Sequence, residues 1–542
     1  MFRFRWVECQ LEALRKCLTV SSVRHALRNL PPTLDATYDR ILINIPQEYR
    51  REAHCALQLL TVSCRPLKLH EVAEAVAVDP EREIFDPENR LRDPEALLEI
   101  CSSLLVLSGY VIHFSFPNCS SDELRFAHYS VHEYLVSDRI SQRTSYNFRA
   151  VEREAHGLYA RVLLIYYLSV IEIVSSLRKR SFSRYELDEM FPLLPYASCF
   201  WADHLRPATA EGSRGPEFTL TKRLFHPASY SLFLKIWSLF WFPDGQENYE
   251  EIRNLGFDER MDGTESICVK DDTESEYDGN ESEHDNRLFY ASYLGLTDLI
   301  EWLAKEGADV NADSGGSYRF PLIIASIAGH EGVVRLLLDL GAEIEAEGAL
   351  NADTALTFAA IQGYEAVVHM LLDAGARLDG HGKSATALEC AVMSRNDSMV
   401  RMLIERGADV NAFRDFGSPL VIAAEIGDLP MVRLLLENGA QIKGTYDGKS
   451  ALQAAASMGN LEIVQFFLDS GADVNAVAKG GSALQWTALG WARNYMSTAQ
   501  LLLDYGANVN VSDGHGGSAL KEAKSKGRED LVRLLLENGA QD

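Results

Sequence analysis

Two Gly-Lys-Ser triplets are the strongest hint of phosphate chemistry in the sequence. They lie at Gly382-Lys383-Ser384 and Gly448-Lys449-Ser450. A phosphate-binding loop needs another glycine five residues before the one that precedes the lysine, so that backbone N–H groups can wrap the phosphates. Arg377 and Lys443 occupy those positions. Each triplet is therefore interpreted as a turn before a helix, and the sequence predicts no nucleotide or other cofactor.

Other residue patterns typical of catalysis or metal binding are equally weak. His128 and His132 are four residues apart, a spacing that places two imidazoles on one helix face as in some zinc sites, but no third ligand is placed beside them. The chain has no Gly-x-Ser-x-Gly nucleophile elbow, and nothing arranges a Ser, a His and an Asp as a triad. The sequence predicts no metal site, no catalytic residue and no enzymatic activity.

Charge and cysteine content restrict the class of protein further. The formal net charge is −26 over 542 residues, which argues against nucleic acid as a partner because such binding needs clustered Lys and Arg. The nine cysteines include no Cys-x-x-Cys pair, which is typical of reduced thiols inside a cell. The longest uncharged apolar run, residues 162–171, is too short to span a bilayer. We expect a cytoplasmic protein without a membrane partner, with the nucleus as the alternative location.

The C-terminal half repeats one phrase. A Gly-Ala pair recurs with its glycine at positions 307, 341, 375, 407, 439, 471, 506 and 539, in steps of 34, 34, 32, 32, 32, 35 and 33 residues. A fixed period of this length indicates a stack of small structural units. Within one unit, Ser450 stands at an N-cap position, Gly459 separates two apolar helical segments, and Gly471 ends the second. Neither helix can bury its apolar face alone, so the units must stack.

This pattern resembles the ankyrin repeat family across residues 286–542, with about eight repeats. The resemblance implies an α-solenoid that recognises a protein partner. The seventh repeat is irregular, because Leu484 to Leu501 is three residues longer than Leu452 to Phe466. Insertions in repeat proteins fall in loops on one face, often the binding face.

Large side chains in the turns are the candidate partner-binding residues, because aromatic residues and Arg often anchor protein interfaces. They are Tyr318, Arg319, Phe320, Arg414, Phe416, Tyr446, Trp486 and Trp491. The alternative is that each of them packs on a neighbouring hairpin.

The N-terminal half divides by pattern into four segments. Residues 1–45 are expected to be helical. Residues 46–142 show three helical stretches followed by two alternating strands, which predicts a winged-helix α+β domain. Residues 143–243 form a helical connector, and residues 244–285 carry 16 acidic against three basic side chains, which predicts a disordered acidic linker. The whole chain is expected to be mainly α.

Three phrases in this half resemble fungal NACHT proteins, which are NOD-like receptors. They are Phe4-Arg5-Trp6-Val7-Glu8-Cys9-Gln10-Leu11, the stretch from Leu30 to Leu42, and Phe126-Ala127-His128-Tyr129-Ser130-Val131-His132-Glu133-Tyr134-Leu135. The resemblance implies a fungal origin and a winged helix that follows a nucleotide-binding core. The P-loop and acidic motif of that core are absent from this chain.

Three functional hypotheses follow from these patterns. The first is a non-enzymatic scaffold or sensor whose ankyrin array recognises a protein partner and whose winged helix couples that event to signalling, with a complete NACHT protein as a further partner in trans. The second is the sensor half of a NACHT ATPase receptor. The third is a transcription regulator that uses the winged helix. Glu71, Glu74 and Asp79 on the expected recognition helix oppose the third.

Overall fold

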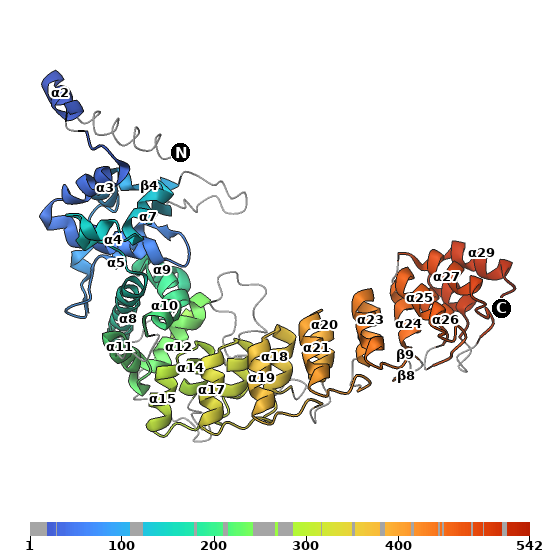
Figure 1. Ribbon diagram of the computed structural model, residues 1–542. Helices are drawn as coiled ribbons and strands as arrows, with labels where there is room; N and C mark the ends of the chain where they lie inside the picture. The colour runs from blue at the N-terminus through green and yellow to red at the C-terminus, as the bar shows by residue number, and fades with distance from the viewer. Residues whose placement is uncertain are drawn as a thin grey trace. The chain divides into compact units, whose positions relative to one another are not determined.

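The computed structural model resolves the chain into two compact units, described separately below. The first comprises residues 1–252 and 258–283, and the second comprises residues 253–257 and 284–542. The structure describes residues 19–28, 30–108, 123–177, 181–209, 215–241, 266–268, 286–315, 317–348, 353–379, 385–412, 417–442, 445–446, 449–478, 481–490, 493–511 and 517–541. Both units are mainly helical, as the sequence predicts (Figure 1).

The first unit contains the predicted winged helix. Its elements are α3 (Leu34–Ile43), α4 (Arg50–Val62), β1 (Leu67–Lys68), α5 (Leu69–Ala75), α6 (Ala96–Cys101), β4 (Leu105–Ser108) and β5 (Glu123–Phe126). The three strands form an antiparallel sheet in the order β1-β5-β4, with Leu107 opposite Leu124. A second small ladder joins β2 (Val78–Asp79) and β3 (Ile84–Phe85). Helix α5 begins at Leu69, where the Glu71 carboxylate accepts the Lys68 N–H at 2.7 Å and caps the helix.

The rest of the first unit is a helical assembly around one long apolar helix. It contains α2 (Val20–Arg28), α7 (Tyr129–Val136), α8 (Glu152–Ser176), α9 (Arg184–Met190), α10 (Leu194–Thr209), α11 (Pro216–Leu224) and α12 (Pro227–Trp241). By length and composition, α8 is able to cross a membrane, yet 67% of its most apolar window is buried within the unit. It packs against α4, α10 and α11, and burial accounts for its composition.

One part of the predicted acidic linker is ordered. Ser266–Cys268 form strand β7, which pairs antiparallel with β6 (Ser181–Ser183), so that Ile267 stands opposite Phe182. The structure therefore places a strand within the predicted linker, and disorder of residues 244–285 stays a prediction. The Ser-Ile-Cys stretch lacks charge in an otherwise acidic segment, and a strand partner far away in sequence gives its backbone hydrogen bonds. The remainder of that segment lies outside the described residues.

The second unit is a row of eight helix pairs, which follow one another along the unit in Figure 1. The pairs are α14 (Arg287–Tyr293) with α15 (Thr297–Lys305), α16 (Pro321–Ile327) with α17 (Glu331–Asp339), α18 (Ala355–Gln362) with α19 (Glu365–Asp373), α20 (Ala387–Met393) with α21 (Asp397–Glu405), α22 (Pro419–Ile426) with α23 (Leu429–Glu437), α24 (Ala451–Met458) with α25 (Leu461–Asp469), α26 (Ala483–Leu489) with α27 (Tyr495–Asp504) and α28 (Ala519–Ser525) with α29 (Glu529–Glu537). Strands β8 (Thr445–Tyr446) and β9 (Lys449–Ser450) pair in the turn before α24. The first helix of each pair packs directly on the first helix of the next.

Asparagine side chains tie successive turns together. Asn475 Oδ1 accepts the Asn508 N–H at 2.7 Å, while its Nδ2 donates to the Gly506 carbonyl at 3.2 Å. Asn311, Asn411 and Asn510 make the same pair of bonds to the turn that follows each of them. The recurring Asn of the repeat phrase is therefore a connection between repeats rather than a ligand.

The irregular seventh repeat approaches its neighbour closely. Gly490 follows α26, and a Cβ placed on it would lie 2.1 Å from the carbonyl oxygen of Ser457 in the preceding repeat. Gly506, in contrast, has a φ of +83° and open space around its Cα. Gly490 is required because a side chain there would overlap Ser457, and Gly506 is required because its backbone is left-handed.

We expect Gly490→Ala to destabilise the repeat unit by about 2 kcal/mol, because backbone atoms must move apart to admit the methyl group. Gly506→Ala should cost about 1 kcal/mol, the usual penalty for a left-handed alanine. Hydrogen exchange of peptides from α24 to α27, measured in both variants, checks the order. A smaller effect at Gly490 than at Gly506 would contradict the close packing of the sixth and seventh repeats.

Candidate interaction surface and a buried polar joint

An exposed row of apolar side chains runs along the first helices of the repeat unit. Tyr293, Ile327, Ile361 and Met393 occupy the same position in the first four repeats, two residues before the break that follows each first helix. Because those helices stack on one another, equivalent positions line up along one face. Ile361 is 38% exposed and Met393 is 36% exposed, while Tyr293 and Ile327 are half-buried. We call these four residues the apolar row.

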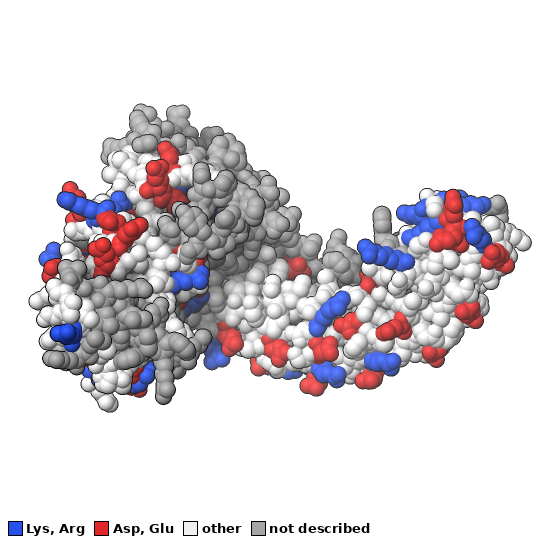
Figure 2. Space-filling view, turned by 90° about the horizontal axis from the view of Figure 1, so that it is seen from above, with Lys and Arg blue, Asp and Glu red and all other residues white. Residues whose placement is uncertain are grey.

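The same position changes character in the later repeats. It holds Glu425 in the fifth repeat and Ser457 in the sixth. The Glu425 carboxylate pairs with Lys449 Nζ at 2.7 Å, and this ammonium lies 4.5 Å from the centre of the Trp486 ring. A cation–π contact and an ion pair thus connect the fifth, sixth and seventh repeats. On the face shown in Figure 2, acidic and basic side chains are interspersed along the repeat unit.

The predicted turn residues of the second repeat pack against the protein. The Tyr318 ring meets Phe358 of α18 edge-on, with ring centroids 5.3 Å apart. Arg319 forms an ion pair with Asp313, and its guanidinium lies 5.3 Å from the centre of the Phe320 ring. These three residues form one cluster and remain half-buried, so part of each side chain stays accessible.

The other predicted residues are placed only in part. Trp486 lies on α26 beneath Lys449, and its indole N–H has no hydrogen-bond acceptor among the described residues. The backbone of Tyr446 pairs in β8. The Tyr446 side chain and the residues Arg414, Phe416 and Trp491 lie outside the described part of the chain. The sequence analysis considered the turns and did not identify the apolar row. Its four positions follow from the repeat period when that period is applied to the ends of the first helices.

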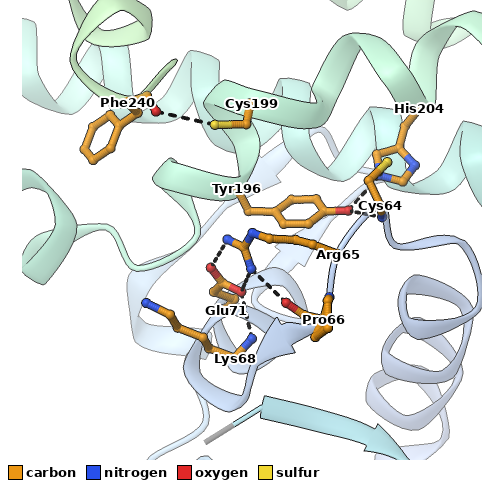
Figure 3. Close-up of polar contacts among 9 residues, drawn as sticks. All are labelled: Cys64, Arg65, Pro66, Lys68, Glu71, Tyr196, Cys199, His204 and Phe240. Carbon is orange, nitrogen blue, oxygen red and sulfur yellow. Dashed lines mark hydrogen bonds and ion pairs between the residues drawn. The ribbon is translucent and has the colours of Figure 1, made fainter. Parts of the chain in front are cut away.

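A buried polar joint connects the winged helix to α10 (Figure 3). Arg65 donates to both carboxylate oxygens of Glu71, at 2.6 and 3.0 Å, and the Glu71 side chain is only 1% exposed. The Arg65 guanidinium also lies 4.9 Å from the centre of the Tyr196 ring on α10. The bidentate pair neutralises a carboxylate that burial would otherwise make costly.

Polar contacts continue from the joint to two histidines. The Cys64 N–H donates to Tyr196 Oη at 2.9 Å. Tyr196 Oη lies 3.0 Å from His204 Nε2, and His204 Nδ1 lies 2.9 Å from His156 Nδ1. His204 has no exposed surface, so burial favours its neutral imidazole.

The cysteine of this joint lies beside a histidine. Cys64 Sγ is 3.7 Å from His204 Nε2. Burial and then the Asp203 charge raise the pKa of the Cys64 thiol, whereas burial and then His156 lower the pKa of His204 to about 3. Both shifts disfavour a preformed thiolate–imidazolium pair.

Helix α5 carries a second buried carboxylate on the same unit. Glu74 Oε1 receives Arg90 Nη2 at 2.6 Å and the Tyr166 hydroxyl of α8 at 2.8 Å. Burial, and then Glu74, raise the pKa of Tyr166, so its hydroxyl stays a donor. Glu71 and Glu74 face inward to arginines and Asp79 lies in β2, so these acidic side chains are not on an exposed face of a recognition helix, as the sequence argument against nucleic acid assumed.

His128 and His132, the two histidines with zinc-site spacing, make contacts within the fold. His128 is the N-cap of α7, where its Nδ1 accepts the Ser130 N–H at 3.2 Å. The His132 ring lies edge-on to Phe126, 6.0 Å between centroids. Within the described ranges, no three His, Cys, Asp or Glu residues are arranged to hold a metal ion.

Comparisons with known proteins agree with this architecture. The model for ankyrin repeats matches residues 288–381, 345–414 and 414–478, and that for the winged helix domain of GPI inositol-deacylase matches residues 39–148. The chain therefore contains ankyrin repeats in its C-terminal region and a winged helix domain in its N-terminal region. Ankyrin repeats support a role in protein–protein interaction.

Two individual proteins resemble parts of this chain. The azaphilone pigments biosynthesis cluster protein L of Monascus ruber is 32% identical over 182 residues, which are 33% of this chain and 36% of that protein. The chain thus spans about a third of that relative's length. The crystal structure of the human ASB11 ankyrin repeat domain shares 26% identity, covering 41% of this chain and 98% of that chain with a TM-score of 0.35.

Removing one member of the Arg65–Glu71 pair should destabilise the first unit unequally. We expect Arg65→Met to cost about 3 kcal/mol, because it leaves a charged carboxylate buried without its partner. Glu71→Gln should cost less, because Arg65 is 33% exposed and can reach water. Urea unfolding of both variants measures the difference. Equal losses would show that the carboxylate does not depend on Arg65.

The buried His204 should make the first unit sensitive to acid. Its folded pKa is about 3, so below pH 6.5 the unfolded chain takes up a proton that the folded chain refuses. Stability is therefore full above pH 6.5 and falls by up to about 1.4 kcal/mol per pH unit as the pH drops toward 3. Urea unfolding at pH 7.5 and 5.5 should show a decrease larger by about 1 kcal/mol in the wild type than in His204→Gln. An identical decrease in both would contradict the neutral buried imidazole.

Proposed function

We propose that this protein is a non-enzymatic scaffold or sensor, in which the ankyrin array recognises a protein partner and the winged helix couples that recognition to signalling in the cytoplasm. The observation that carries the proposal is the apolar row on the first helices. Tyr293, Ile327, Ile361 and Met393 expose apolar surface on a regular stack, where folding alone does not require it. Contiguous exposed apolar side chains on a rigid scaffold are typical of protein interaction sites.

The polar joint supports the coupling half of the proposal. Arg65, Glu71 and Tyr196 hold the winged helix to α10, and Glu74 holds α5 to α8. Buried charge pairs require specific partners in fixed positions, so these elements are expected to move as one body. The cysteine and histidines of the joint serve this packing, and their protonation states do not suit catalysis.

A second candidate is that the same architecture forms the sensor half of a longer NACHT-type receptor of fungal origin. The observation that favours it is the order of the parts, with receptor-like phrases preceding a winged helix that precedes the repeats. An immunoblot of the source organism with an antibody against the repeat unit tests it. A product several hundred residues longer than 542 supports the receptor, and a product of this length supports a separate scaffold that works with a receptor in trans.

The apolar row should determine partner binding. Tagged full-length protein is expressed in its source organism, and the proteins recovered with it are quantified by mass spectrometry against an empty tag. Ile361→Asp combined with Met393→Asp should lower recovery of the partner by about tenfold or more, because two carboxylates would be desolvated on binding.

The control is Leu536→Asp, which places one carboxylate on the second helix α29, where the side chain is 50% exposed, and it is compared with Ile361→Asp alone as well as with the double variant. This variant should recover the partner as the wild type does. Unchanged recovery in the double variant, with circular dichroism showing both proteins folded, would contradict recognition through the apolar row. Equal loss in both variants would indicate general destabilisation instead.

A further inference from the structure

The winged helix contains a cavity that is part of neither the polar joint nor the repeats. Its volume is about 440 Å³, and it is lined by Ile43, Arg50, Arg51, His54, Thr144, Ser145, Asn147 and Phe148. This volume lies within the range of small-molecule sites. The lining comes from the end of α3, the first two turns of α4 and the segment before α8, so tertiary packing alone assembles it.

The lining is cationic in a chain that is strongly acidic overall. No carboxylate is among the eight lining residues, although the sequence holds 78 Asp and Glu. Arg50 is positioned by neutral groups, since its Nε donates to the Ile45 carbonyl at 3.2 Å and its Nη2 to the Ile43 carbonyl at 3.0 Å. Within the described ranges, Arg50 has no carboxylate partner, so its charge is not neutralised by an ion pair.

Arg51 is also held by the backbone. Its Nη2 donates to the carbonyls of Val76 and Val78 at 3.2 and 3.1 Å, and its Nη1 lies 3.6 Å from Asp79 Oδ2. Asp39 accepts the Thr144 hydroxyl at 3.1 Å and the Ser145 N–H at 2.9 Å, and Glu48 and Glu52, next to the two arginines in sequence, are not among the lining residues. Asp39 and Asp79 therefore hydrogen-bond or pair with residues of the cavity wall, but they are not among the residues that line the cavity.

The hydrogen-bonding role of His54 is fixed by its neighbour. Gln58 Nε2 donates to the Arg149 carbonyl at 2.9 Å, which identifies that atom as the amide nitrogen, and it lies 3.1 Å from His54 Nε2. His54 Nε2 must then accept, so the hydrogen of the neutral ring is on Nδ1. Burial lowers the pKa of His54 and favours this neutral tautomer. The ring adds an N–H donor to the two guanidiniums.

We propose that this cavity binds a phosphorylated small molecule, with Arg50 and Asn147 beside the phosphate and with Ile43 and Phe148 against the organic part. The Nη1 hydrogens of Arg50 are left for phosphate oxygens, because its backbone bonds use Nε and Nη2, and a dianion gains more from this charge than a weaker monoanion does. The cavity is larger than an inorganic phosphate ion needs, and its apolar side chains give an organic group a surface to contact. This proposal is independent of the apolar row.

Isothermal titration of the full chain tests the proposal at constant ionic strength. The probes are phenyl phosphate, glucose 6-phosphate and inorganic phosphate, with phenol and glucose as uncharged controls. We expect at least one organic phosphate to bind about tenfold or more tightly than inorganic phosphate, and the uncharged compounds not to bind. Equal affinities for all three phosphates would overturn the organic half of the proposal and assign the cavity to the free anion.

Three variants separate the cavity from general charge effects. Arg50→Gln removes a guanidinium, and Asn147→Asp places a carboxylate at an exposed residue whose side chain has no hydrogen bond to lose. Each should weaken binding about tenfold or more, and Asn147→Asp remains informative if Arg50→Gln disturbs folding. Arg92→Gln, at an exposed arginine of the same domain outside the cavity, should bind as the wild type does. No binding of any phosphate, or equal weakening by Arg92→Gln, would overturn the proposal.

Discussion

The structure depends on the fact that no single ankyrin repeat can bury its own apolar surface. Each first helix has seven or eight residues, most of which are buried, and helices of that length are not stable alone in water. The first helices bury one another in sequence, and the asparagine bonds of Asn311, Asn411, Asn475 and Asn510 align the turns. Stacking also lines up equivalent positions, which is why four separate side chains form one apolar row.

A different constraint organises the first unit. Helix α8 is apolar around most of its circumference, so it must be surrounded by other helices. Surrounding it brings the polar face of α5 inside, and the two carboxylates at Glu71 and Glu74 then require cationic partners. Arg65 and Arg90 supply them. Desolvation in the same joint raises the pKa of the Cys64 thiol and lowers that of His204 to about 3.

The two units thus offer complementary means of interaction. The repeat unit exposes apolar side chains in its first four repeats and a Glu425–Lys449–Trp486 chain of contacts in the later ones. The first unit offers a cavity with two arginines that are held in place by backbone carbonyls. One surface suits a protein partner, and the cavity suits a small anionic ligand.

The sequence by itself determined the repeat fold and the winged helix, because both follow from local spacing. Glycines about 33 residues apart and serines at N-cap positions fix where helices begin and end, whatever lies beyond them. Tertiary structure alone decided the pairing of Ser266–Cys268 with β6, the burial of Glu71 and Glu74, and the inward packing of Tyr318 against Phe358. Those outcomes depend on contacts between residues far apart in the chain, and the local periodicity of one segment carries no information about the side chains that another segment will place against it.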